Sequence, residues 1–369
     1  MPSSPAGMPP LDASADKIGW FEFASPKYFY IPIGLYCSWL ALRYGGLMLP
    51  TCSNPALPHS GFVGESKKQV LDSLSGPSRQ YIAPYKAIQH NGSIEQTYTA
   101  VIEAMQQLDT QFPVVMKPDL GMRGAGVQKI NSPSDVKKYL ENFPHNASFL
   151  LQQLIDYKGE AGVFYVRHPD WKTGKLISLT LKYFPTLIGD GENNIATLLQ
   201  QSPRAGKLQH LYRTKLTPIL QDTPAKGAEI PLAFAGNHCR GAIFRNGNTY
   251  ITQALTQKFD QIAKDIKIEE ESGFFIGRFD VRFQNFEQFL KGEDFKIIEI
   301  NGAGGEATHI WDSRTTLPQA YKSLMTQFKH IYQIGHKNKK RGHRPSSLSH
   351  FLKDWKTEKT LTNLYPPSS

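Results

Sequence analysis

Gly277-Arg-Phe-Asp-Val-Arg-Phe283, followed after a charged spacer by Phe295-Lys-Ile-Ile-Glu-Ile-Asn301, decides the fold, because both stretches read as strands that carry polar residues. In the first, apolar residues alternate with Arg278, Asp280 and Arg282; in the second, Glu299 and Asn301 share one face. Burying an unpaired carboxylate is costly, so a positive partner is expected between the strands. Oxygen ligands on strands suit Mg²⁺ held together with nucleotide phosphates. Two surface strands whose acids are solvated or paired with the neighbouring arginines are the alternative.

The size and composition of the chain indicate a globular protein of two or three domains. It has 369 residues, of which 40% are apolar and 20% are charged. Its three cysteines form no CxxC motif and no Cys/His cluster at zinc spacing, which argues against a disulfide scaffold or a structural zinc site. A reducing, cytoplasmic location is expected. Residues 1–18 are predicted to be a disordered lead-in, and the first 16 lack the regions of a signal peptide.

Residues 28–42 are the one candidate for a membrane span. Lys27 and Arg43 bound this uncharged run of 15 residues, and Pro32 and Gly34 interrupt it. A spanning helix needs roughly 20 apolar residues. We therefore expect a buried helix, or a strand followed by a helix, and no transmembrane segment.

The net charge of +10 is concentrated at the end of the chain. Residues 336–369 hold eight Lys or Arg against two acids, a net +6, so the first 335 residues carry only +4. This basic tail is a candidate for contact with an anionic lipid, an RNA or an acidic partner. A solvated tail that ends in a short amphipathic helix is the alternative.

Helices and strands alternate along the chain, but several strands are consecutive. Helices are predicted after Ser66, over 93–108, from Ser132-Pro133 and over 255–266; strands are predicted over 112–116, 147–155, 162–167 and 176–184. Consecutive strands favour an α+β fold with a mixed or antiparallel sheet over a doubly wound fold.

Two further stretches carry polar chemistry. A strand ends at Lys117 and runs into a loop with Gly121, Gly124 and Gly126, a composition that brings backbone N–H groups close to phosphates. The spacing matches neither GxGxxG nor the Walker motif, and a surface turn is the alternative. Downstream, an apolar strand enters a polar hinge, and Gly159-Glu160 begins the next strand. Glu160 is a candidate for binding ribose hydroxyls or, alternatively, an exposed turn residue.

The order of these pieces resembles the ATP-grasp superfamily over residues 112–311. The pieces are a strand-final lysine with a glycine loop, Gln-x6-Glu, an Arg-x-Asp strand and Glu-x-Asn. The resemblance is greatest to carboxylate–amine ligases such as D-alanine–D-alanine ligase and cyanophycin synthetase, and Thr186-Leu-Ile-Gly-Asp-Gly191 is similar to a segment of the latter. It implies an α+β fold of two α+β lobes that clamp ATP, preceded by a small α/β domain. The implied divisions are the lead-in, 19–92, a small lobe at 93–165, a large lobe at 166–335 and the tail.

The resemblance also implies a role for each matching residue. Lys117 contacts the α/β-phosphates, and the loop with Gly121, Gly124 and Gly126 is a lid over the β/γ-phosphates. Gln153 meets adenine, Glu160 holds the ribose, and Asp280, Glu299 and Asn301 ligate two Mg²⁺ ions, with Mn²⁺ as an alternative metal. Arg278 and Arg282 approach the transferred phosphate, Lys182 reaches a phosphate, and either Lys67 or Lys68 supplies another contact to ATP.

The implied reaction is ATP-dependent amide bond formation between a small-molecule carboxylate and an amine. The carboxylate attacks the γ-phosphorus to give an acyl phosphate and ADP, and the amine then displaces phosphate. Backbone N–H groups of Gly304 and Gly305, with Arg278, are candidates for stabilising the oxyanion. Departures from the family pattern lie at Gln153, where glutamate is common, and at residues 302–309, so a D-alanine substrate is not assumed.

The substrate site is less defined by the sequence. Arg240 and Arg245 are candidates for clamping a substrate carboxylate, although residues 245–248 also read as a hairpin turn with an exposed arginine. His309 and Asp312 are candidates for lining the acceptor site. An ATP-grasp kinase, a non-catalytic nucleotide-binding module and a nucleic-acid binder that uses the tail are alternative functions, and a homodimer is left open. Truncation after Gly335 is predicted to leave ATP binding intact.

Overall fold

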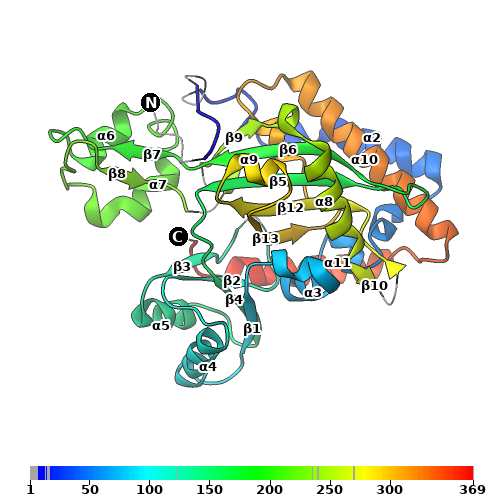
Figure 1. The fold of residues 1–369 in the computed structure, drawn as a ribbon, viewed down its shortest axis with the longest axis horizontal. Coiled ribbons are helices and arrows are strands. Elements are labelled where there is room, and N and C mark those ends of the chain that lie inside the picture. The colour runs from blue at the N-terminus through cyan, green and yellow to red at the C-terminus, as the bar shows by residue number, and fades with distance from the viewer. Residues whose placement is uncertain are drawn as a thin grey trace.

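The computed structural model describes residues 7–12, 14, 17–122, 124–234, 236–238, 241–268 and 271–368. Helices make up 41% and strands 19% of the chain, and adjacent strands in its sheets pair antiparallel. The predicted α+β fold is confirmed. Two sheets dominate the architecture, a small one and a large one (Figure 1).

The small sheet has the strand order β1-β4-β2-β3. Its strands are β1 (Tyr85–His90), β2 (Val114–Pro118), β3 (Gln128–Ile130) and β4 (Ala147–Gln153). Helices α4 (Ile94–Gln107) and α5 (Pro133–Glu141) pack against it through one apolar cluster. Both helices begin where the sequence predicts, because the Ser93 and Ser132 hydroxyls accept hydrogen bonds from the backbone N–H three residues on.

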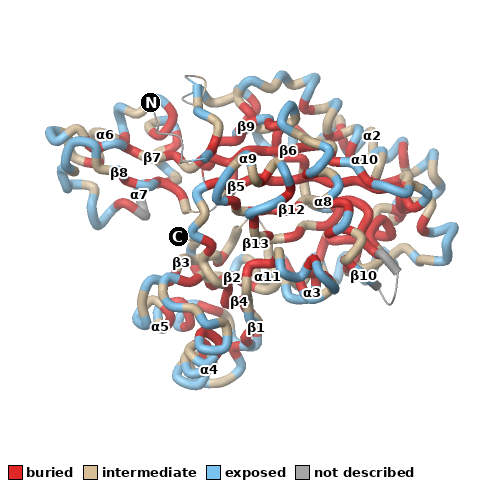
Figure 2. Tube along the Cα trace, viewed as in Figure 1, coloured by how far each residue is buried: buried red, intermediate tan, exposed pale blue. Residues whose placement is uncertain are grey.

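The large sheet has the order β13-β12-β5-β6-β9. Its strands are β5 (Gly159–Val166), β6 (Lys175–Tyr183), β9 (Ile243–Asn246), β12 (Ile276–Phe283) and β13 (Phe295–Asn301). These strands are buried along most of their length (Figure 2). Helix α8 (Gln253–Lys264) covers one face, where Phe259 packs in one cluster with Phe279 and Val281. Because side chains alternate along a strand, the polar residues of β12 point to the opposite face.

Smaller elements surround this frame. They are α1 (Pro26–Phe29), α2 (Ile31–Tyr44), α3 (Lys67–Asp72), β7 (Thr186–Ile188), α6 (Ile195–Gln201), α7 (Gln209–Leu216), β8 (Glu229–Pro231), β10 (Lys267–Ile268), β11 (Glu271–Ser272), α9 (Phe286–Leu290), α10 (Leu317–Lys340) and α11 (Leu348–Leu364). Short 3₁₀ helices include η2 (Leu49–Cys52), η3 (Pro58–Gly61), η4 (Gly76–Tyr81), η5 (Thr217–Ile219), η7 (Asn248–Tyr250) and η8 (Thr308–Trp311). Among the described residues, no helix combines the length and apolar character that a membrane span requires.

The prediction of a buried helix over residues 28–42 is half wrong. The segment forms α1 and α2, and α2 packs on α10 through Ile33 and Leu40. Its opposite face is apolar but exposed, at Ile31, Leu35, Trp39 and Leu42. Both faces of the helix are apolar, so the composition of the segment does not indicate which face is buried.

The basic tail is not a solvated appendage. Helix α10 includes its first residues, and α11 packs against the body through polar and apolar contacts. Glu358 accepts a hydrogen bond from the Gly64 N–H at 2.9 Å, and Tyr365 stacks on Phe143 with ring centroids 5.4 Å apart. The short helix expected at the end of the tail is present as α11, whereas residues 336–340 belong to α10 and not to a solvated stretch.

Part of the predicted lead-in also packs on the body. Met8 is buried in the main core, and the Tyr183 hydroxyl donates to the Pro9 carbonyl at 2.7 Å. Residues 7–12 therefore do not lie free, although they contain three prolines or glycines. The other divisions predicted from the sequence stay predictions.

Candidate active site

The polar face of the large sheet carries the acids predicted to hold a metal. Asp280 on β12 lies opposite Glu299 on β13, and Arg278 lies opposite Asn301 in the same ladder. Asp280 also pairs with Gly162 on β5, where an added Cβ would lie 3.2 Å from the Asp280 carboxylate. The antiparallel pairing of β12 and β13 therefore brings together polar residues that lie about 20 positions apart in the sequence.

Asp280 is the centre of a buried ion-pair network. Its carboxylate accepts from Lys182 Nζ at 2.8 Å, from Arg278 Nε and Nη2 at 3.0 Å, and from Asn301 Nδ2 at 3.2 Å. Burial alone would raise the pKa of Asp280, but Arg278 and Lys182 outweigh it and lower the pKa to about 2. The carboxylate is therefore ionised at neutral pH.

Lys182 connects this network to Glu160. Its Nζ lies 3.3 Å from the Glu160 carboxylate, whose other oxygen accepts from Arg282 Nε at 3.2 Å. Glu160 is 2% exposed, so the alternative of an exposed turn glutamate is wrong. Arg282 also reaches the backbone carbonyls of Ile155 and Tyr157 at 3.4 Å. It therefore lies at the Glu160 end of the site, away from Arg278, whose Nη1 donates to the Glu306 carbonyl at 2.9 Å.

Lys117 links the two sheets. From β2 its Nζ donates to Gln152 Oε1 on β4 at 2.9 Å and to the Ile298 carbonyl on β13 at 2.8 Å. Burial lowers the pKa of Lys117 to about 8. Lys117, which precedes the glycine-rich loop, thus contacts β13, and β13 pairs with β12, the other strand predicted to hold a metal.

Lys67, and not Lys68, faces this site. Ser66 caps α3, and the first residue of the helix, Lys67, donates from Nζ to the Gly121 carbonyl at 2.9 Å and lies 4.0 Å from Glu299. Lys68 points away and pairs with Asp72 at 2.6 Å. Helical geometry separates the two side chains, a distinction the sequence left open.

Two polar residues at the site were not predicted. Gln152 contacts Lys117, whereas for Gln153 the backbone N–H donates to the Pro84 carbonyl at 2.9 Å. The position of Gln152 could have been predicted from strand alternation. Phe149 and Leu151 face the small-sheet core, so Gln152 must face the other way. Glu65 accepts from the Gly302 N–H at 3.1 Å, and burial raises its pKa to about 8. No sequence pattern pointed to Glu65.

The glycine-rich loop contacts the C-terminal segment. Gly121, Gly124 and Gly126 have φ values of +144°, +71° and +69°, which other residues rarely adopt. An added Cβ at Gly126 would lie 3.0 Å from Tyr365, and Ser368 Oγ donates to the Gly124 carbonyl at 2.6 Å. The loop therefore has neighbours in the C-terminal segment that nothing in the sequence indicated.

The turn after β13 is packed tightly against residues 59–62. Ala303 N–H donates to the Ser60 carbonyl at 2.8 Å, and a Cβ at Gly304 would lie 2.5 Å from the Gly61 carbonyl oxygen. The Gly305 N–H already donates to the Gly302 carbonyl at 3.0 Å. Its predicted role as an oxyanion donor would require this turn to open, and Gly304 is the better candidate.

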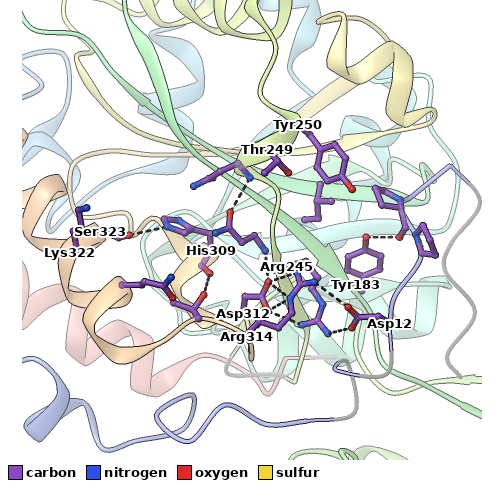
Figure 3. A pocket seen from close by; sticks show the side chains of 17 residues that line it. Asp12, Tyr183, Arg245, Thr249, Tyr250, His309, Asp312, Arg314, Lys322 and Ser323 are labelled. Carbon is purple, nitrogen blue, oxygen red and sulfur yellow. Dashed lines mark hydrogen bonds and ion pairs between the residues drawn. The ribbon is translucent and has the colours of Figure 1, made fainter.

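The predicted substrate residues lie elsewhere. His309, Asp312 and Arg245 line a pocket of about 610 Å³ beside the edge strand β9 (Figure 3). His309 bridges the Ser178 and Ser323 hydroxyls at 2.6 and 3.1 Å, and burial lowers its pKa to about 4. Arg245 is buried and pairs with Asp312 at 3.3 Å, so the hairpin turn with an exposed arginine is wrong. Arg240 lies outside the described residues.

The donor set fits a Mg²⁺–phosphate complex. Two carboxylates and an amide oxygen on adjacent strands are the ligands that Mg²⁺ prefers. Asn301 uses its amide nitrogen to reach Asp280, so its amide oxygen is turned to the other side. Lys67, Lys117 and Lys182 surround these acids with positive charge that phosphates can use.

No family model and no curated protein matches this chain. Solved structures to which it is similar include a bifunctional glutathione synthetase from Pasteurella multocida (16% identity, TM-score 0.33, 70% of this chain and 36% of that one). Others are carboxyaminoimidazole ribonucleotide synthase from Aspergillus clavatus complexed with ATP (12%, 0.38, 66% and 45%) and the D-alanine-D-alanine ligase from Coxiella burnetii (11%, 0.37, 75% and 59%). The chain thus spans less than half the length of the first two proteins. The similar solved structures are ATP-grasp ligases, the superfamily that the sequence motifs resemble.

Proposed function

We propose that this protein is an ATP-dependent ligase that activates a small-molecule carboxylate as an acyl phosphate and transfers the acyl group to an amine. One observation carries the proposal. Lys117 from the small sheet is buried and donates to the Ile298 carbonyl, next to Glu299 on β13. Lys182 and Asp280 of the large sheet form a buried ion pair, and Asp280 lies opposite Glu299 in the ladder. Burying so many charges is costly, and a bound polyphosphate with its cation accounts for them together.

ATP is proposed to lie between the two sheets. Lys117 and Lys182 contact its phosphates, Lys67 adds a further positive charge, and the loop over Gly121 and Gly126 covers the β/γ end. Glu160 receives the ribose, and the polar hinge at Gln153 meets adenine. Arg282 is proposed to position Glu160 rather than to meet the transferred phosphate, because the two side chains are 3.2 Å apart.

Asp280, Glu299 and Asn301 are proposed to hold Mg²⁺, with two ions expected. When bound, Mg²⁺ neutralises the charge that develops on the transferred phosphate. The protein's own part is to keep the ligands ionised and oriented. The low pKa of Asp280 and its bonds to Arg278 and Asn301 serve that purpose.

The proposed reaction has two steps. A carboxylate oxygen attacks the γ-phosphorus, the bond to the ADP oxygen breaks, and Arg278 stabilises the acyl phosphate. The amine nitrogen then attacks the acyl carbon, and phosphate leaves with the electron pair of the broken C–O bond and takes up the proton that the nitrogen loses. Water must be excluded because an acyl phosphate hydrolyses, and the glycine-rich loop is suited to that role. A cytoplasmic location belongs to this proposal, because ATP is a substrate and Cys37 and Cys52 are free thiols.

Product analysis tests the proposal. The protein, incubated with Mg-ATP and pools of carboxylates and amines, should release ADP and form a new amide that mass spectrometry detects. A phosphorylated product without an amide would instead support a kinase. Mg-ATP binding with background ADP release in every mixture would favour a non-catalytic module. Either result would contradict the ligase.

A further inference from the structure

The exposed face of α2 is an apolar surface that no other part of the described chain covers. In α2, Leu35, Trp39 and Leu42 are 70%, 50% and 85% exposed. Tyr28, in the preceding helix α1, is 76% exposed. Since successive residues lie about 100° apart around a helix, positions 31, 35, 39 and 42 fall on one side, opposite Ile33 and Leu40. Contiguous exposed apolar surface marks an interaction site more often than a scatter of single residues does. We call Tyr28, Ile31, Leu35, Trp39 and Leu42 the α2 stripe.

The helical layer behind the stripe is positively charged. Helices α2 and α10 lie side by side at the edge of the molecule (Figure 1). Tyr321 Oη on α10 donates to the Phe29 carbonyl at 3.1 Å, and His336 on α10 lies 3.2 Å from the Tyr44 carbonyl at the other end. The helices therefore run parallel, and the basic end of α10 lies beside the C-terminal end of the stripe.

Acids are missing from both segments of this layer. Residues 23–64 contain Lys27 and Arg43 but no Asp or Glu, and residues 313–353 contain nine Lys or Arg and again no acid. Lys27 and Arg43 bound the stripe at its two ends, and both are exposed. The Arg43 guanidinium lies 5.5 Å from the Trp39 ring. Apolar and aromatic residues flanked by cations are typical of a helix that lies in a membrane interface.

We propose that the α2 stripe docks this protein on an anionic lipid bilayer, with α2 lying in the plane of the headgroups. The charge around the α2 stripe favours a bilayer over a second copy of the chain as its partner. A two-fold interface would bring the same residues of both copies together, so Lys27 and Arg43 would meet cations and find no acid in the segment to pair with. Anionic headgroups provide the missing negative charge, and the acyl region receives the leucines. The inference goes beyond the proposed ligase and does not depend on it.

Vesicle flotation of the full chain tests the proposal. The protein should float with vesicles of phosphatidylcholine that contain a quarter phosphatidylserine, and much less with phosphatidylcholine alone. The double change Leu35→Glu and Leu42→Glu should lower the partition coefficient at least about tenfold, because two carboxylates would enter the interface. Ile219→Glu, at an exposed apolar residue on η5, is the matched control and should float like the unchanged protein.

Three results would overturn the proposal. The unchanged protein could fail to float with anionic vesicles, or the stripe variant could float equally well. Alternatively, light scattering could show a dimer that the stripe variant loses, with no vesicle binding, which would assign the stripe to a second copy. Circular dichroism and thermal melting should match between the variant and unchanged protein, which shows that a loss of flotation is not unfolding. ADP release is a separate readout, so failure here leaves the ligase proposal standing.

Discussion

Burial and charge pairing shift the pKa of Asp280 in opposite directions, and the close approach of two cations makes pairing the larger effect. Desolvation favours a neutral carboxyl, but Arg278 and Lys182 at 3.0 and 2.8 Å stabilise the anion and lower its pKa to about 2. Glu299 is different, because among the described residues the cation nearest to it is Lys67, at 4.0 Å. Of the two facing acids, Glu299 is therefore the one with fewer bonds to break when a metal binds.

Substitution of Glu299 tests the metal assignment. Glu299→Gln removes one charge but keeps the side chain's size, so turnover dependent on Mg²⁺ should fall at least about a hundredfold. The melting temperature should stay close to that of the unchanged protein, since Glu299 is partly exposed. Glu293→Gln, at an exposed acid that precedes the same strand, is the matched control. Full activity of Glu299→Gln in a steady-state ADP-release assay would refute the assignment.

Lys117 and Glu65 make nucleotide binding sensitive to pH. Burial lowers the pKa of Lys117 to about 8 and raises that of Glu65 to about 8. As pH rises through this range, Lys117 loses its positive charge and Glu65 gains a negative one, so the site repels phosphate more. The affinity for Mg-ATP should fall above pH 8 by about tenfold per pH unit for each group.

Calorimetric titration of Mg-ATP between pH 7 and pH 9.5 measures this effect. Glu65→Gln should retain the part due to Lys117, and therefore show about half the slope of log Kd against pH. An affinity that does not change over this range would contradict the proposed placement of the phosphates beside Lys117. A slope unaffected by Glu65→Gln would show that the charge of Glu65 does not act on them.

Among the elements, those with local signals were predictable from sequence. Ser66, Ser93 and Ser132 each cap a helix in the structure, as their positions indicated. The alternation in β12 correctly separated the core face from the polar face, because one side of the strand is buried under α8. Side-chain period and caps depend on a few neighbouring residues, so a single sequence is enough to find them.

Contacts between distant segments were not predictable in the same way. Lys67 and Lys68 are adjacent in sequence, and the docking of α3 decides which one faces Glu299. The contact of Tyr365 with the glycine loop joins segments about 240 residues apart in sequence, and no local pattern announces it. The α2 stripe was misjudged because composition does not tell which face of an apolar helix finds a partner.

The contact of α11 with the glycine-rich loop changes an expectation drawn from the sequence. Truncation after Gly335 was expected to leave ATP binding intact, but Tyr365 and Ser368 support the loop. Tyr365→Ala should leave the fold in place, raise hydrogen exchange over residues 119–127, and weaken Mg-ATP binding about tenfold. Trp355→Ala, at an exposed aromatic residue of the same helix, should change neither. Unchanged exchange in the loop of Tyr365→Ala would show that the C-terminal segment does not hold it.

On the scale of the whole molecule, the site depends on both sheets. Lys117 reaches across from the small sheet to the Ile298 carbonyl of the large sheet, and α11 contacts the loop of the small sheet and the segment before α3. Relative movement of the sheets would therefore open and close the proposed ATP site. The α2 stripe lies on another surface, so membrane docking and nucleotide binding are separable in experiments.

Trapping of the acyl phosphate is the most direct test of the central claim. Hydroxylamine can replace the amine, so only the carboxylate has to be found among a pool of small acids. With Mg-ATP, the unchanged protein should release ADP and convert one carboxylate into its hydroxamate, and Glu299→Gln should form neither product. ADP release that is coupled to a stable phosphate ester, with no hydroxamate, would contradict carboxylate activation. The absence of ADP release with every carboxylate would contradict the proposed enzyme.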